Sequence, residues 1–156
     1  MDGLIREQLI KALEQGWGTY IMRFKQLSPA QQAAFLQRQG YARLADLLAH
    51  VIAWWQVGLA AVERMLVDPH YTSPDVDVDS FNARAVARFQ HTGEARVIRK
   101  YESLRAAWLA LVNGLPAPAF ADARIAQRLE IELIGHLDEH NLDDAQDASF
   151  VVEENA

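Results

Sequence analysis

The segment from Tyr41 to Val67 constrains the fold more than any other part of the chain. Its apolar residues recur at intervals of three and four, the spacing that places side chains on one face of an α-helix. They are Leu44, Leu48, Val51, Ile52, Trp55, Leu59, Val62 and Leu66. Small or polar residues, including Ala49, Gln56 and Glu63, mark the opposite arc. The pattern predicts a long helix that is mostly buried.

Three further segments have the same periodicity, and no segment shows the sustained two-residue alternation of a strand. They cover residues 9–27, 97–115 and 125–140. Two shorter helical patterns flank the long helix, one beginning at Ser28 and one around Phe81. Ser28, Pro29 and Gln31 have the types and spacing of a capping box at a helix start. We therefore predict an all-α fold, a four-helix bundle with short connecting helices.

The composition indicates one soluble domain. With 156 residues and 51% hydrophobic content, the chain can bury one core of ordinary size. We expect a helical domain over residues 1–142 and an acidic tail over residues 143–156. The net charge of -6 argues against nucleic acid as a partner. Because we find neither a leader pattern nor a long uncharged segment, we expect a cytoplasmic protein with no membrane partner.

The chain has no cysteine, so a catalytic or metal-binding group must be histidine, carboxylate, hydroxyl or water. His136 and His140 stand four residues apart near the end of the last helical pattern. At this spacing both imidazoles leave the same helix face and can bind one metal ion. A third ligand must come from elsewhere, and His50, at the flank of the long apolar stripe, is the candidate. The alternative is that these histidines are structural and bond to neighbours such as Glu132, Glu139 or Asp46.

Two carboxylates near the histidine pair are candidate catalytic groups. Glu139 lies within the pair, and Glu132 lies one turn before His136 on the same face. Either could act as a general base or orient a metal ligand. The string from His136 to His140 also fits the H-x-x-E-H pattern of inverted zinc peptidases. We interpret that match as fortuitous, because only sixteen residues follow His140.

The chain resembles the DinB-like superfamily in two places: His50 within Leu47-Leu48-Ala49-His50-Val51-Ile52-Ala53-Trp54, and the H-x-x-x-H pair on the last helix. The segments 77–84 and 108–116 further resemble its ClbS/DfsB-like branch. This resemblance implies a four-helix bundle in which His50, His136 and His140 bind a divalent metal ion, often zinc or nickel. It also implies activities ranging from thiol-dependent transfer to protection against reactive metabolites.

Three functional hypotheses follow. The first is a metal-dependent hydrolase or thiol-type transferase that acts on a small molecule, with Trp54, Asp46 and Asn82 as candidates for binding beside the histidines. The second is a protein that binds or sequesters a small molecule without catalysis, and the third is a helical interaction module. Ile131 and Ile134 form a second apolar side on the last helix, from which we predict a homodimer.

Overall fold

The computed structural model describes residues 2–143 and 145, and this part of the chain is all-α, without a strand. The predicted acidic tail therefore lies outside the described residues, apart from Asp143 and Ala145. Helical structure accounts for every segment in which the sequence shows three-and-four periodicity. The fold class predicted from the sequence is thus confirmed at the level of all-α.

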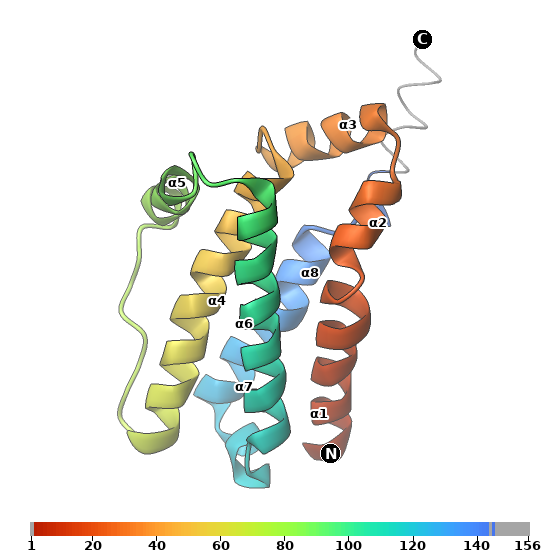
Figure 1. Ribbon diagram of the computed structural model, residues 1–156. Helices are drawn as coiled ribbons and strands as arrows, with labels where there is room; N and C mark the ends of the chain where they lie inside the picture. Colours follow the sequence, from red (N-terminus) through yellow and green to blue (C-terminus); the bar gives the residue numbers. More distant parts are fainter. Residues whose placement is uncertain (1, 144, 146–156) are drawn as a thin grey trace.

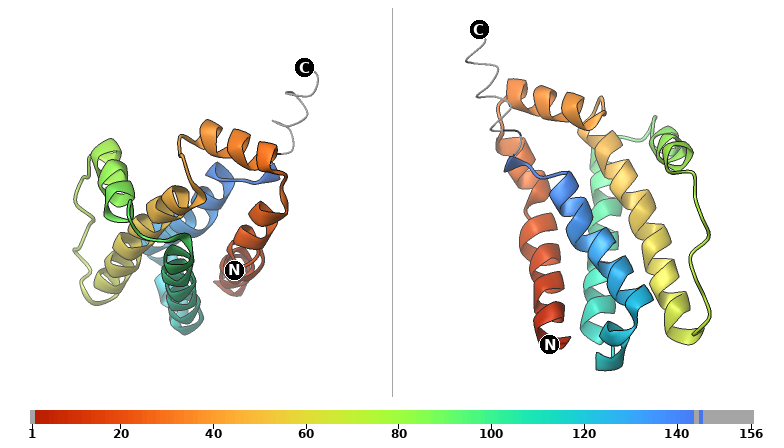
Figure 2. Two further views of the ribbon diagram at one scale, coloured as in Figure 1. Left: turned by 45° about the horizontal axis from the view of Figure 1, so that its top comes forward. Right: turned by 180° about the vertical axis from the view of Figure 1, so that it is seen from behind.

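Four long helical segments run side by side (Figure 1). The first consists of α1 (Asp2–Lys11), η1 (Ala12–Trp17) and α2 (Tyr20–Gln26). The second is α4 (Leu44–Val67), and the third is α6 (Glu94–Gly114). The fourth consists of α7 (Ala123–Glu130), η3 (Ile131–Gly135) and α8 (His136–Glu139), preceded by the short turn η2 (Ala117–Ala121). Seen from behind, this last segment lies between the first segment and α4 (Figure 2).

Two short helices lie at one end of these segments. α3 (Pro29–Gln39) crosses from the end of α2 to the start of α4, and α5 (Val78–Arg88) lies beside the first half of α4 (Figures 1 and 2). α3 begins with the predicted capping box, in which Ser28 and Gln31 each bond to the other's backbone. Residues from both short helices can therefore reach this end of the core.

The core is built from the predicted stripes. Leu129 and Leu133, which the sequence places in the core, are both fully buried. Three aromatic rings pack at its centre: Trp17 and Trp55 have ring centroids 5.0 Å apart, and Trp55 stacks on Tyr101 at 5.4 Å. Both indoles also donate hydrogen bonds to the last helical segment, from Trp17 Nε1 to the Leu133 carbonyl and from Trp55 Nε1 to the Glu132 carbonyl. The aromatic core thus holds the backbone of that segment just before the two histidines.

Two stretches are wound as π-helix, which the sequence does not predict. These are η1 and η3, and they lie against each other in the core. A π turn departs from the regular hydrogen-bond ladder of the α-helix, and such turns are frequent at functional sites. The indoles of Trp17 and Trp55 bond to carbonyls inside η3. Gly16 permits the close approach of η1 to α8, because a Cβ atom there would collide with Cδ2 of Leu137.

α4 is the one helix in the described part of the chain that is long and apolar enough to cross a membrane. Of its most apolar window, 72% is buried inside the protein, as in the core helix of a soluble protein. Of the two isoleucines behind the predicted homodimer, Ile131 is 48% exposed, whereas Ile134 packs partly against the core. The homodimer stays a prediction.

Candidate functional site

His50, His136 and His140 meet at the end of the core that α3 and α5 cover; we call these three residues the histidine cluster. The His50 ring centroid lies 5.4 Å from that of His136 and 5.1 Å from that of His140, and the latter two are 6.0 Å apart. Each residue is at most 7% exposed. Three imidazoles from distant parts of the sequence are therefore gathered in one buried place, as expected from the sequence.

The π turn η3 helps to align the polar residues of the last segment. On a regular α-helix, positions four apart advance by about 40° around the axis, so a row of such positions drifts across the surface. A wider π turn counters that drift. Glu132, His136 and His140 follow each other at this spacing, and η3 spans the first step of the row. All three side chains are consequently buried on the inner side of the segment.

Two amides hold the outer nitrogens of two rings. Nδ1 of His50 lies 2.9 Å from Oδ1 of Asn82 on α5, and Nδ1 of His140 lies 2.7 Å from Oε1 of Gln39 at the end of α3. An amide oxygen only accepts hydrogen bonds, so each Nδ1 is assigned the proton. The other nitrogen, Nε2, then carries the lone pair. This is the arrangement in which an imidazole serves as a metal ligand with its orientation fixed by an outer partner.

His136 has a carboxylic acid as its neighbour instead of an amide. Its Nδ1 lies 4.0 Å from Oε1 of Glu132 and has no hydrogen-bond partner. Glu132 is 1% exposed, and its Oε2 has no partner either. Gly58 of α4 makes room for this side chain, since a Cβ atom on Gly58 would lie 2.5 Å from Oε2. The cluster thus leaves several buried polar atoms unsatisfied, which is uncommon and calls for a ligand or a functional role.

Burial sets the protonation of the site. It lowers the pKa of His136 to about 4 and that of His140 to about 3, and the charge of protonated His50 adds to both effects. Burial also lowers the pKa of His50, against the hydrogen bond to Asn82. In Glu132, burial raises the pKa to about 8, although the charge of Arg128 opposes the shift. At neutral pH the three imidazoles are therefore neutral and Glu132 is mostly protonated.

The ring separations can be compared with those of a three-histidine metal site. Imidazoles bonded at about 2.1 Å and tetrahedral angles place their ring centres roughly 5 Å apart. Two of the three separations match, whereas the 6.0 Å between His136 and His140 is wider. Correspondingly, no group of three or more His, Cys, Asp or Glu side chains in the described residues is already arranged to hold an ion. The rings of His136 and His140 would have to move closer together to bind one ion with His50.

The other predicted site residues take different places. Trp54 donates from Nε1 to Oδ1 of Asn82 at 2.7 Å, so these two residues form a chain of contacts to His50. Asp46 forms an ion pair with Arg43 at 2.7 Å, and the structure shows no bond from it to a histidine. Glu139 is exposed. Burial raises the pKa of Tyr41 to about 12, and the negative charge of Glu139 adds to this shift. Of the two predicted catalytic carboxylates, only Glu132 is therefore buried next to a cluster histidine.

Sequence reasoning missed Gln39 and Gly58. Gln39 is the last residue of the short helix α3, and its hydrogen-bond partner, His140, is 101 positions away in the sequence. Tyr41, whose ring centroid lies 5.8 Å from that of His50, is marked in the sequence only as the start of the long helix. For Gly58, the one available signal was a glycine inside a strongly apolar helix, which often marks a close approach of another group.

Comparisons with family models, curated proteins and solved structures returned no match to this chain.

Proposed function

We propose that the histidine cluster binds one divalent transition-metal ion and that the protein uses it in hydrolysis or group transfer on a small molecule. The observation that carries this proposal is the convergence of three buried, neutral imidazoles, two of them held by amide oxygens through Nδ1. Gathering three imidazoles without a shared ligand leaves buried polar atoms such as His140 Nε2 unpaired, at a cost in stability. A metal ion would remove that cost.

The ligand atoms that the cluster offers determine which metal ions it can bind well. Neutral imidazole nitrogens suit zinc, nickel and other transition ions, whereas magnesium and calcium prefer oxygen ligands. We therefore propose Zn²⁺ or Ni²⁺. The positions of the three histidines, on the second and last of four long helical segments, also support a DinB-like four-helix bundle of the ClbS/DfsB-like branch as the finer description of the fold.

A bound ion of this kind polarises an electrophile or lowers the pKa of water. Glu132 is the residue that can move the proton. Its carboxyl group lies beside His136, is shielded from solvent, and has a pKa raised to about 8, close to working pH. Asn82 and Gln39 orient the rings of His50 and His140, and Trp54 donates a hydrogen bond to Asn82. Glu139, at the exposed rim, is the second candidate for proton transfer.

Metal analysis of the untagged protein tests the first half of the proposal. After dialysis against zinc or nickel, the wild type is expected to retain one equivalent per chain. His136→Ala should lose it while remaining helical by circular dichroism. His91→Ala, which removes an exposed histidine outside the cluster, is the matched control and should retain the ion. Retention of the ion by His136→Ala, or no retention by the wild type, would contradict the proposal.

Turnover tests the second half. Metal-loaded and chelator-treated protein would be compared on a panel of activated esters and electrophiles, with and without added thiol. We expect turnover only with metal, and we expect Glu132→Gln to keep the ion and lose the turnover. Metal binding with no turnover of any panel member would instead favour the non-catalytic binding protein.

A further inference from the structure

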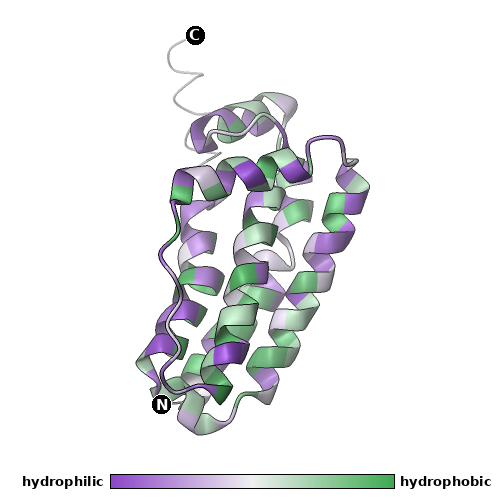
Figure 3. Ribbon diagram, turned by 90° about the vertical axis from the view of Figure 1, so that its left-hand side faces the viewer, coloured by the Kyte–Doolittle hydropathy of each residue, from purple (hydrophilic) through white to green (hydrophobic). Residues whose placement is uncertain are grey.

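A groove is lined by residues of α4, by the segment that connects α4 to α5, and by Arg128 of α7. Figure 3 shows the course of that connecting segment along the molecule. Its volume is about 600 Å³, and its lining includes Trp54, Val57, Arg64, Tyr71, Val76 and Arg128. Three of the protein's exposed large apolar residues, Val57, Val76 and Val78, line it. Apolar surface that is gathered in a concave place in this way is typical of a ligand site.

Arg128 of α7 closes one part of this groove and also lines the adjoining pocket. Its Nη1 donates to Oγ of Ser73 at 3.2 Å, which fixes the plane of the guanidinium group. Nε and Nη2 are buried, and neither has a hydrogen-bond partner in the described structure. These two nitrogens form one edge of the guanidinium, and that edge is closed to solvent, so Arg128 lines the groove with the rest of its side chain.

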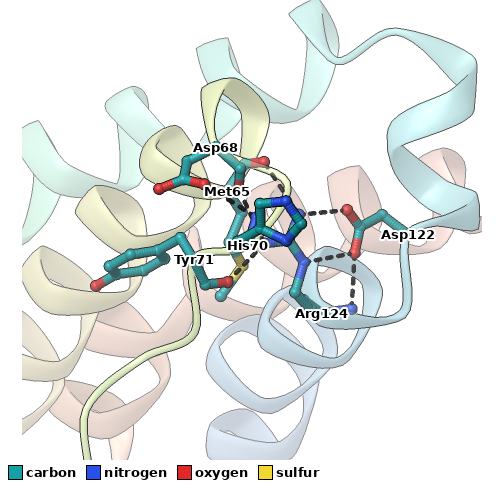
Figure 4. Close-up of polar contacts among 6 residues, drawn as sticks. All are labelled: Met65, Asp68, His70, Tyr71, Asp122 and Arg124. Carbon is teal, nitrogen blue, oxygen red and sulfur yellow. Dashed lines mark hydrogen bonds and ion pairs between the residues drawn. The ribbon is translucent and has the colours of Figure 1, made fainter.

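The segment that carries Ser73 is held in place by a neighbouring arginine. Figure 4 shows Arg124 between the end of α4 and the turn at Asp122. Its guanidinium donates to the backbone carbonyls of Met65, Asp68 and Tyr71 and pairs with Asp122. All of its nitrogens are thus used inside the chain. One turn later on the same helix, Arg128 keeps two buried nitrogens without a hydrogen-bond partner.

The charge in the groove favours an anion. Arg64, whose guanidinium lies 5.3 Å from the centre of the Tyr71 ring, adds a second positive charge beside Arg128. Asp75 is the one acidic residue in the lining and opposes them. Most of the remaining lining is apolar, and it includes Trp54, Val57, Ala60, Val76 and Val78. The groove is therefore positively charged at one end and mostly apolar along the rest.

We propose that this groove binds a small molecule with a carboxylate on an unbranched apolar chain, the carboxylate at the end of the groove that Arg64 and Arg128 line. The chain lies along Val57 and Val76 toward Trp54. The far end of such a ligand lies beside Trp54, which shares Asn82 Oδ1 with His50 as a hydrogen-bond partner. Binding in the groove requires no metal, so this proposal can be tested separately from the proposed metal chemistry.

An internal partner for Arg128 is the competing explanation. Glu132 lies one turn further along the same segment, and its Oε2 also lacks a hydrogen-bond partner. A change of rotamer in solution would allow the two side chains to pair. In that case Arg128 would serve the fold rather than a ligand.

Octanoate is the probe, titrated calorimetrically into chelator-treated protein, with octanamide as its uncharged analogue. We expect one octanoate per chain, with accompanying quenching of tryptophan fluorescence, and much weaker binding of octanamide. Arg128→Gln should weaken octanoate binding by about tenfold or more. Arg128→Lys, which keeps the positive charge, should give a smaller loss. Arg99→Gln, an exposed arginine on α6, is the matched control and should not change the affinity.

Several outcomes would overturn the proposal. Equal binding of octanoate and octanamide, or unchanged affinity in a folded Arg128→Gln, would show that Arg128 does not bind the carboxylate. Tighter binding of octyl phosphate than of octanoate would show that the groove prefers a phosphate to a carboxylate as the anionic group of its ligand. A marked gain of affinity in Glu132→Gln would show that Glu132 pairs with Arg128 in the free protein. His136→Ala, which disables the metal site, should bind octanoate as the wild type does.

Discussion

The surroundings of Arg124 at one end of the molecule and the histidine cluster at the other end both remove polar groups from solvent, but they satisfy them differently. Every nitrogen of the Arg124 guanidinium bonds to a carbonyl or to Asp122. In the cluster, His136 Nδ1, His140 Nε2 and Glu132 Oε2 are buried without a partner. Because an unpaired buried polar atom costs stability, the first region is explained by the fold alone and the second is not. The difference separates a structural site from a candidate binding site.

The largest loss of stability is expected from Arg124→Gln. This change removes the donors that join the end of α4 and the following segment to α7. We expect the midpoint of urea unfolding, followed by circular dichroism, to fall further than in a variant of Gly58, Glu132 or Arg128. Arg128→Gln should leave the midpoint nearly unchanged, since two of its three nitrogens have no partner to lose. If the urea midpoint falls by a similar amount in Arg124→Gln and Arg128→Gln, the contrast between a fully bonded and a partly unbonded arginine is wrong.

A methyl group on Gly58 is expected to cost about 1–3 kcal/mol, the usual range for overpacking a core. In Gly58→Ala the new Cβ would collide with the carboxyl group of Glu132. Urea unfolding would measure the cost, and Glu132→Ala provides the matched background because it removes the colliding atoms. The cost of Gly58→Ala should shrink in that background. If the two changes are additive, Glu132 does not occupy the place described.

Loss of either outer amide should weaken metal binding without abolishing it. Asn82→Ala and Gln39→Ala each free one imidazole to rotate, and removal of such outer partners typically reduces metal affinity by about 10–100-fold. Competition with a chromophoric zinc chelator would measure the effect. Asn113→Ala, at an exposed position on α6, serves as the control. Unchanged affinity in both amide variants would mean that these amides do not orient metal ligands.

The smallest expected effect concerns pH and the metal-free protein. Burial raises the pKa of Glu132 from 4.5 to about 8, so the folded protein holds a proton that the unfolded chain releases. Glu132 therefore stabilises the fold fully below its unfolded pKa, and this contribution is lost as the pH rises toward 8. In the presence of a chelator, the free energy of unfolding of the wild type, relative to Glu132→Gln, should fall between about pH 5 and pH 8. A constant difference across that range would contradict the buried, protonated carboxyl.

The sequence predicted the helices, the capping box at Ser28 and the meeting of His50 with the two later histidines. Periodicity reports which face of a helix is buried, and the i, i+4 spacing of His136 and His140 needs only local geometry. Periodicity could not predict the π-helical turns η1 and η3, because a π turn depends on packing between segments far apart in sequence. Gln39 and Arg128 were missed for a related reason. Their roles come from partners that no local pattern identifies, and in Arg128 from donors left without a partner.

X-ray absorption of the zinc-loaded protein tests the central claim most directly, because it counts the imidazoles around the ion. We expect three histidine nitrogens at about 2.0–2.1 Å from zinc, with the remaining coordination by light atoms. His140→Ala should lower the imidazole count by one or release the ion. A wild-type spectrum with fewer than three imidazoles, or an identical spectrum in His140→Ala, would contradict the assignment of His50, His136 and His140 as one metal site.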